Sequence, residues 1–101
     1  MIKNFKIFEN YEPEKAEIID GLERLLQHSS SFVIGKTRFK VERIDNKKYN
    51  VIIDHTIDNI RKVNQNIGQL NYYFSIENFK KHGDVKEEIE GDGFYRLKVI
   101  L

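Results

Sequence analysis

The chain of 101 residues has a formal net charge of +1, and 40% of its residues are hydrophobic and 33% charged. This length fits one domain with a single core rather than two, and the share of bulky apolar residues excludes a disordered chain. The absence of cysteine excludes disulfides, thiolate nucleophiles and cysteine metal sites, and it agrees with a reducing cytoplasm, where we expect the protein to act.

The N-terminal part of the chain predicts a short strand and then a long helix. Residues 4–8 alternate weakly between apolar and polar, which is typical of a strand. Pro13 suits the first turn of the following helix, because its missing N–H would have no partner there. Apolar residues then recur every three or four positions until the helix ends near His28. They form one stripe that we expect to face the core: Ile18, Ile19, Leu22, Leu25 and Leu26.

The middle of the chain predicts a short strand followed by a β-hairpin. Residues 32–34 and 37–44 have strand-like composition, and Gly35 indicates a kink or bulge between them. Asp and Asn within residues 45–48 favour a tight turn, after which residues 49–53 return as the second strand of the hairpin. This returning strand has apolar residues on both faces, so we expect it to be central in the sheet.

The C-terminal part predicts two helices and a second hairpin. Residues 57–67 carry an apolar stripe at helical spacing, and Gly68 favours the end of that helix. Residues 70–75 fit a strand and a helix equally well. Ser75 can cap a short helix over residues 76–82. A Gly-Asp-Gly turn then predicts a hairpin whose two strands cover residues 85–90 and 94–101.

Together these elements predict a single α+β domain over residues 1–101, with the long N-terminal helix packed on a largely antiparallel sheet. An alternative is a winged-helix-like C-terminal half, because two helices and a hairpin occur there in the order of that fold. In a winged helix, the second helix enters the major groove of DNA. Here the second helix is aromatic and the hairpin is acidic, so this half does not suit contact with DNA.

Positive charge is concentrated in the middle of the chain. Residues 31–82 carry ten cations and five acids, and residues 36–48 alone carry six cations and two acids. On an extended strand Lys36, Arg38 and Lys40 would point to one face, away from the core. The cations that we expect to contact nucleic acid are Lys36, Arg38, Lys40, Arg43, Lys47, Lys48, Arg61 and Lys62. The alternative is that these cations protect an edge strand against aggregation.

The C-terminal hairpin is acidic, which predicts contact with a protein partner that has a basic surface. Exposed tyrosines before it would add apolar contact area, or stack on unpaired bases. The residues that we expect to contact a protein partner are Glu87, Glu88, Glu90, Asp92, Tyr72 and Tyr73. The alternative is a solvated acidic face with the tyrosines in the core.

No motif predicts catalysis, a metal or a cofactor. His55 and Asp58 lie three residues apart with Asp54 nearby, but a metal site would need further ligands. His28 lies beside three serines without the oriented third group that Ser–His catalysis requires. His82 suits the role of a cation at a helix C-terminus. We therefore expect a protein that is not an enzyme and that needs no cofactor and no metal.

These observations predict a non-enzymatic binding or accessory module that acts on or beside nucleic acid and its processing enzymes through the basic hairpin. The alternative is a protein-binding inhibitor or regulator of phage or mobile-element type that uses the acidic hairpin. The abundance of Lys, Ile and Asn is typical of an AT-rich genome, such as that of a low-GC bacterium. No apolar run approaches the ~20 residues that cross a bilayer, so we expect no contact with a membrane.

Overall fold

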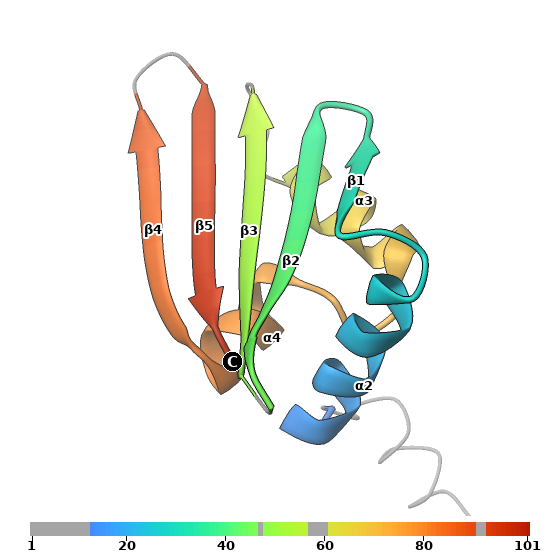
Figure 1. Cartoon of the computed structure of the whole chain (residues 1–101). Helices are drawn as coiled ribbons and strands as arrows, with labels where there is room; N and C mark the ends of the chain where they lie inside the picture. Colours follow the sequence, from blue (N-terminus) through green and yellow to red (C-terminus); the bar gives the residue numbers. More distant parts are fainter. Residues whose placement is uncertain (1–12, 47, 57–60, 91–92) are drawn as a thin grey trace, which may run out of the picture.

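The computed structural model describes residues 13–46, 48–56, 61–90 and 93–101, so the strand expected at residues 4–8 lies outside it. The described part of the chain forms three helices and five strands, whose arrangement is drawn in Figure 1. Their order is α2 (Lys15–Leu26), β1 (Ser31–Ile34), β2 (Thr37–Asp45), β3 (Lys48–Thr56), α3 (Arg61–Leu70), α4 (Ile76–His82), β4 (Asp84–Glu90) and β5 (Phe94–Ile100).

The five strands form one antiparallel sheet in the order β1-β2-β3-β5-β4. The pairs β1–β2, β2–β3 and β4–β5 are hairpins, and the pairing of β3 with β5 joins the two halves of the sheet. Between β3 and β4 the chain leaves the sheet to form α3 and α4 (Figure 1). The α+β class is confirmed, and so is the central position of the strand that returns from the first hairpin.

The helices pack against one face of this sheet and bury it. Alternate residues of the three inner strands point to the helices: Thr37, Phe39, Val41, Tyr49, Val51, Ile53, His55, Tyr95, Leu97 and Val99. Ile18 of α2, Val63 of α3 and Phe79 of α4 meet them and are 0% exposed. Each fully buried side chain of this size contributes about 1.5–3 kcal/mol. The opposite face carries no helix in the part of the chain described, and we call it the open face.

Helix α2 is two residues shorter at each end than the sequence predicted. It begins at Lys15 because Glu14 caps it: the backbone N–H of Glu14 donates to Oε1 of Glu17 over 2.9 Å. Gly21 sets how closely this helix approaches the loop between α3 and α4. A Cβ at that position would lie 2.7 Å from Nδ2 of Asn71, so a glycine is needed for this contact.

Helix α3 extends past Gly68 to Leu70, so the prediction that Gly68 ends the helix is wrong. The backbone ladder continues, because the N–H of Asn71 still donates to the carbonyl of Ile67 over 3.3 Å. A glycine lowers helix propensity but does not interrupt the hydrogen bonds. The first predicted residues of this helix, 57–60, lie outside the described part of the chain.

The loop between α3 and α4 is neither the strand nor the helix that the sequence allowed. The side-chain oxygen of Asn71 accepts a hydrogen bond from the N–H of Tyr73 over 2.8 Å, which turns the backbone. Ser75 then caps α4 as predicted, since its hydroxyl accepts from the N–H of Asn78 over 3.1 Å. Phe74, between these two turns, is buried against Phe39 and Phe79.

The C-terminal hairpin is part of the main sheet and does not form a separate wing. Strand β5 pairs with β3 along its whole length, from Ile100 beside Asn50 to Phe94 beside Thr56. The winged-helix-like alternative is therefore wrong. Element order alone suggested it, and element order does not specify that β5 would insert between β3 and β4.

Candidate functional site

On the open face, side chains of neighbouring strands line up in rows across the sheet. The register places Lys40 of β2 beside Ile52 of β3, Ile52 beside Lys98 of β5, and Lys98 beside Lys86 of β4. We call Lys40, Ile52, Lys98 and Lys86 the lysine row. Neighbouring strands lie about 4.8 Å apart. The row thus brings three cations from three strands close together with no acid among them.

A second row, two residues along each strand, alternates in sign: Arg38, Asp54, Arg96 and Glu88. Arg96 donates to Asp54 from Nε over 2.6 Å and from Nη2 over 3.3 Å. The same guanidinium lies over the ring of Phe94, with 5.3 Å from Cζ to the ring centroid. Arg38 is the other register partner of Asp54, but it forms no ion pair with any described residue. Its charge therefore remains available to a ligand.

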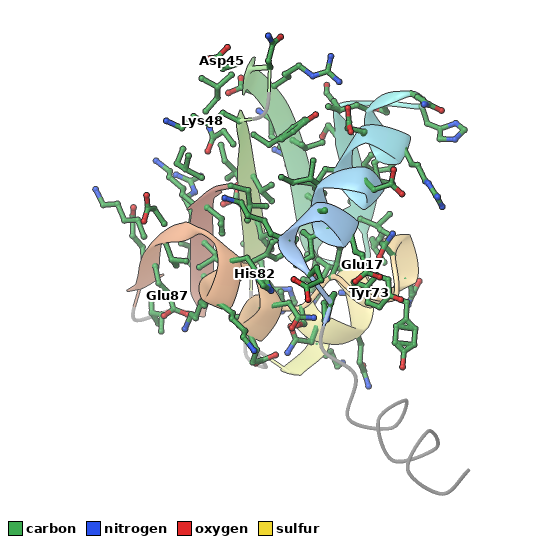
Figure 2. The ribbon with its side chains drawn as sticks, turned by 90° about the horizontal axis from the view of Figure 1, so that it is seen from below. Glu17, Asp45, Lys48, Tyr73, His82 and Glu87 are labelled. Carbon is green, nitrogen blue, oxygen red and sulfur yellow. The ribbon has the colours of Figure 1, made fainter. Side chains whose placement is uncertain are left out.

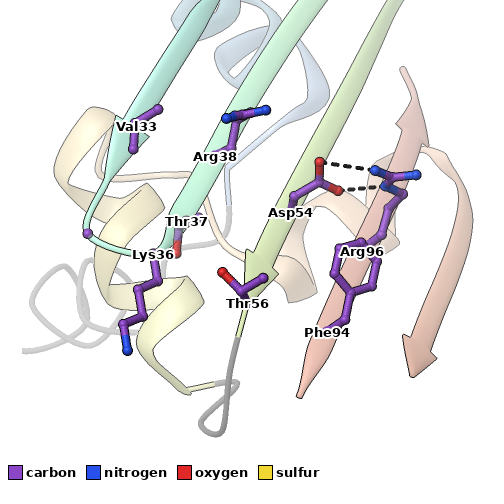
Figure 3. A pocket seen from close by; sticks show the side chains of 9 residues that line it. Val33, Lys36, Thr37, Arg38, Asp54, Thr56, Phe94 and Arg96 are labelled. Carbon is purple, nitrogen blue, oxygen red and sulfur yellow. Dashed lines mark hydrogen bonds and ion pairs between the residues drawn. The ribbon is translucent and has the colours of Figure 1, made fainter. Parts of the chain in front are cut away.

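The second row leads into a hollow of about 490 Å³ on the open face. Figure 3 shows Lys36 and Arg38 on its β2 side, Thr56 and Asp54 on β3, and Phe94 and Arg96 on β5. Gly35 has a φ of 58°, a left-handed conformation that glycine adopts without strain, and this turn places Lys36 at the rim. The backbone N–H of Thr56 donates to the carbonyl of Lys36 over 3.3 Å and holds the turn against β3.

Four of the cations predicted to contact nucleic acid lie on or beside the open face. Lys36, Arg38 and Lys40 are exposed there, and Lys48 is exposed at the opposite end of β3. None of these four forms an ion pair within the described residues. The alternation in the sequence therefore predicted correctly that Lys36, Arg38 and Lys40 point away from the core.

Two of the other predicted cations, Arg43 and Lys62, do not join this surface. Arg43 points to the helix side, where its Nη2 lies 3.4 Å from Oε2 of Glu23 and its Cζ lies 5.7 Å from the ring centroid of Tyr49. Lys62 is exposed on α3, on the helix side of the sheet. Lys47 and the side chain of Arg61 lie outside the description.

The residues predicted to contact a protein partner are spread over the molecule. Figure 2 shows Glu87 and Tyr73 on opposite sides. Tyr72 is 86% exposed and makes an edge contact with the half-buried Tyr73, with 5.4 Å between ring centroids. Glu88 is on the open face beside Arg96. The side chain of Glu90 and residue Asp92 lie outside the description.

Glu87 lies on the helix side of β4 and is bound within the protein. The hydroxyl of Tyr95 donates to its Oε2 over 2.7 Å, and Nζ of Lys80 on α4 lies 2.9 Å from its Oε1. These two hydrogen bonds lower the pKa of Glu87, whereas burial and the hydrogen bond to Glu87 raise the pKa of Tyr95. The three residues join α4 to the C-terminal hairpin. The position of Glu87 therefore has a structural explanation that does not require a protein partner.

Two of the three histidines, His55 and His82, have structural contacts. His55 is buried, and its Nδ1 lies 2.8 Å from the hydroxyl of Thr37, which also accepts from Nδ2 of Asn66 over 2.8 Å. Nε2 of His82 donates to the carbonyl of Pro13 over 2.9 Å and ties α4 to the start of α2. His28 is exposed, and Asp58 lies outside the description. Among the described residues no group of acids and histidines could hold a metal ion.

Three cations of the open face were not among the predicted contacts: Arg96, Lys98 and Lys86. The alternation of the last strand did place Arg96 and Lys98 on its outer side. Residues 83–101, which contain all three, carry three cations and five acids, so the charge of the segment gave no reason to select them. Only the pairing of β5 with β3 brings them to the same surface as Lys40 and Arg38.

No family model, curated protein or solved structure matches this chain. In the part of the chain described, no helix is both long enough and apolar enough to cross a membrane.

Proposed function

We propose that this protein is a non-enzymatic binding module that holds nucleic acid on the open face of its sheet. The observation that carries the proposal is the lysine row, in which Lys40, Lys98 and Lys86 point to the same face with no acid between them. Lys36 and Arg38 extend this positive surface toward the hollow. A polyanion supplies the counter-charge that such a surface lacks.

The physical basis is the release of counterions from the phosphate backbone. Each phosphate that a lysine or arginine neutralises releases condensed cations, so affinity falls as salt rises. The small net charge of the whole chain does not oppose this, because the described cations of the open face outnumber its acids Glu42, Asp54, Asp84 and Glu88, and further acids lie elsewhere. Glu23 and Glu87, for example, are paired with Arg43 and Lys80 on the helix side of the sheet.

The test is a titration of a fluorescent oligonucleotide, followed by anisotropy at several salt concentrations. We expect binding whose affinity decreases with salt, and the combined changes Lys40→Gln and Lys98→Gln should reduce the slope of log K against log salt by about 1.4 for a single strand. The control combines Lys15→Gln and Arg24→Gln, which removes two exposed cations from α2 on the helix side. Absence of salt-sensitive binding by the natural protein, or an equal effect of the control, would refute the proposal.

A second candidate is a regulator that binds a protein partner at the outer edge of β4. This strand ends the sheet, and Ile89 on it is 67% exposed. An edge strand can pair with an extended segment of a partner, and the acids of β4 suit a basic segment. If so, Glu88→Lys should abolish a complex that Glu42→Lys, on the open face of β2, leaves intact. A complex that tolerates Glu88→Lys would exclude this edge.

A further inference from the structure

The hollow on the open face has two walls of different chemistry, on either side of strand β3 (Figure 3). Its volume of about 490 Å³ lies within the range of sites that bind small organic groups. Since β2 and β5 are two strand spacings apart, the walls are separated by roughly 10 Å. A ligand that fills the hollow must therefore present different groups at its two ends.

The β2 wall is cationic and free to bind an anion. Lys36 and Arg38 both line the hollow, both are exposed, and neither forms an ion pair with a described residue. An arginine can meet two oxygens of a phosphate at once, and a lysine adds a mobile positive charge beside it. This wall has the chemistry of a phosphate site.

The β5 wall is planar and locally neutral. The ring of Phe94 and the guanidinium of Arg96 form it, and Asp54 already balances the charge of Arg96 through two hydrogen bonds. The same carboxylate fixes the orientation of the guanidinium. A flat surface of this kind favours stacking with a nucleobase, because every base has a π-face whatever its sequence. The hydroxyl of Thr56 lies between the walls, on the β3 strand where a sugar would pass.

We infer that this hollow receives one unpaired nucleotide of a single strand, with its phosphate against Lys36 and Arg38 and its base against Phe94 and Arg96. This rests on the proposed function and adds that the protein prefers single strands. In a duplex the bases are stacked on one another and cannot enter the hollow, so only the backbone contacts of the lysine row remain. DNA and RNA strands share the chemistry involved.

The test compares Phe94→Leu with Tyr72→Leu. Both changes remove one aromatic ring, but Tyr72 is 86% exposed in the loop between α3 and α4, away from the open face. Each variant is titrated with a single-stranded DNA, a single-stranded RNA and a duplex of the same length at one salt concentration. We expect Phe94→Leu to weaken binding of single strands about tenfold and to leave duplex binding and the salt slope unchanged. We expect Tyr72→Leu to change none of these.

A second measurement uses the natural protein, so it does not depend on the folding of a variant. The ring protons of Phe94 should shift in NMR spectra on addition of a single strand and remain in place on addition of a duplex. The inference fails if Phe94→Leu binds single strands as the natural protein does, or if duplex binding falls equally. It also fails if adenosine monophosphate displaces the strand at equal concentration, since the site would then be one for a free nucleotide.

These outcomes separate the inference from the proposed function. Salt-sensitive binding that depends on Lys40 and Lys98 but not on Phe94 would retain the proposed function and overturn the nucleotide site. If the natural protein bound none of the three nucleic acids, both the proposed function and the nucleotide site would be overturned.

Discussion

Lys86 of β4 and Lys98 of β5 are direct register partners on the open face, so two like charges face each other across neighbouring strands. Directly opposed like charges destabilise an antiparallel pair. Asp84 and Glu88 lie two residues away on β4, at the register positions of Ile100 and Arg96 rather than of Lys98. The pair therefore costs stability in the free protein, and a bound polyanion would remove that cost.

We predict that Lys86→Glu makes the free protein more stable and its complex with nucleic acid weaker. A glutamate there would face Lys98 across the strands and stabilise the pair by about 0.5 kcal/mol. Thermal unfolding measures the first effect and oligonucleotide anisotropy the second. Lys15→Glu is the control for binding, because Lys15 is exposed on α2, on the helix side of the sheet. A Lys86→Glu variant that is less stable, or that binds equally well, would contradict the prediction.

The bond between Glu87 and Tyr95 predicts a loss of stability in acid. The hydrogen bonds from Tyr95 and Lys80 lower the pKa of Glu87 below its usual value in the folded state. A lowered pKa contributes stability that is present above the unfolded value of about 4.3 and is lost as the pH falls through the folded value. We expect Glu87→Gln to reduce the free energy of unfolding at pH 7 by about 1 kcal/mol, since the pair is partly exposed.

The difference in stability between Glu87→Gln and the natural protein should shrink as the pH falls below 4, and urea titrations at several pH values measure it. At alkaline pH the dependence has the opposite direction, because stability is lost as the pH rises. Burial, followed by the hydrogen bond to Glu87, raises the pKa of Tyr95, so this contribution is complete below about pH 10 and is lost above it. Tyr95→Phe should remove the alkaline loss. A difference that is constant with pH would show that the hydrogen bond does not couple to titration.

Gly83, between α4 and β4, should not tolerate a side chain. A Cβ there would lie 2.5 Å from Cγ1 of Val99 and 2.8 Å from the backbone oxygen of Ile100. We expect Gly83→Ala to destabilise the protein by about 1–3 kcal/mol through this overlap. Gly68→Ala is the matched control, since a Cβ on this residue of α3 would lie 4.0 Å from the backbone oxygen of Phe74, an ordinary contact distance. It should stabilise the protein by about 0.5–1 kcal/mol in the same urea titration.

The hydroxyl of Thr37 joins three elements of the fold, because it contacts His55 of β3 and Asn66 of α3 from its own place in β2. Thr37→Val keeps the shape of the side chain and removes the hydroxyl from the buried His55 and the half-buried Asn66. We expect a loss of about 1–3 kcal/mol in the free energy of unfolding. Thr37→Ser retains the hydroxyl and should lose much less. Equal losses would indicate that the methyl group, and not the hydrogen bonds, matters at this position.

Local alternation predicted much of the sheet and part of the candidate site. It gave the strands of the first hairpin and the outward direction of Lys36, Arg38 and Lys40, because the side-chain period of a strand depends only on the strand itself. The same alternation assigns Arg43 to the face of Phe39 and Val41. We selected Arg43 as a nucleic-acid contact for its charge and did not consider its place in the pattern, which puts it on the helix side.

The remaining part of the open face depends on contacts between distant residues. Lys98 and Arg96 reach Lys40 and Arg38 only because β5 pairs with β3, more than 40 positions earlier in the chain. No local pattern specifies which strand will be the neighbour of another. Charge balance over a segment was misleading for the same reason, because acids that are close in the sequence separate in the fold: Glu87 lies on the helix side of β4, whereas Glu88 lies on the open face beside Arg96.

The strand order also has a consequence for synthesis on the ribosome. Strand β5 follows every other strand in the sequence yet lies between β3 and β4. Until residues 94–100 emerge, at roughly 5–20 residues per second, one side of β3 presents its backbone amides and apolar side chains without a neighbour. A nascent chain at that stage resembles an unprotected sheet edge, which readily joins other chains. Assembly of the two halves is therefore the step at which slow translation would expose this protein to chaperones or to aggregation.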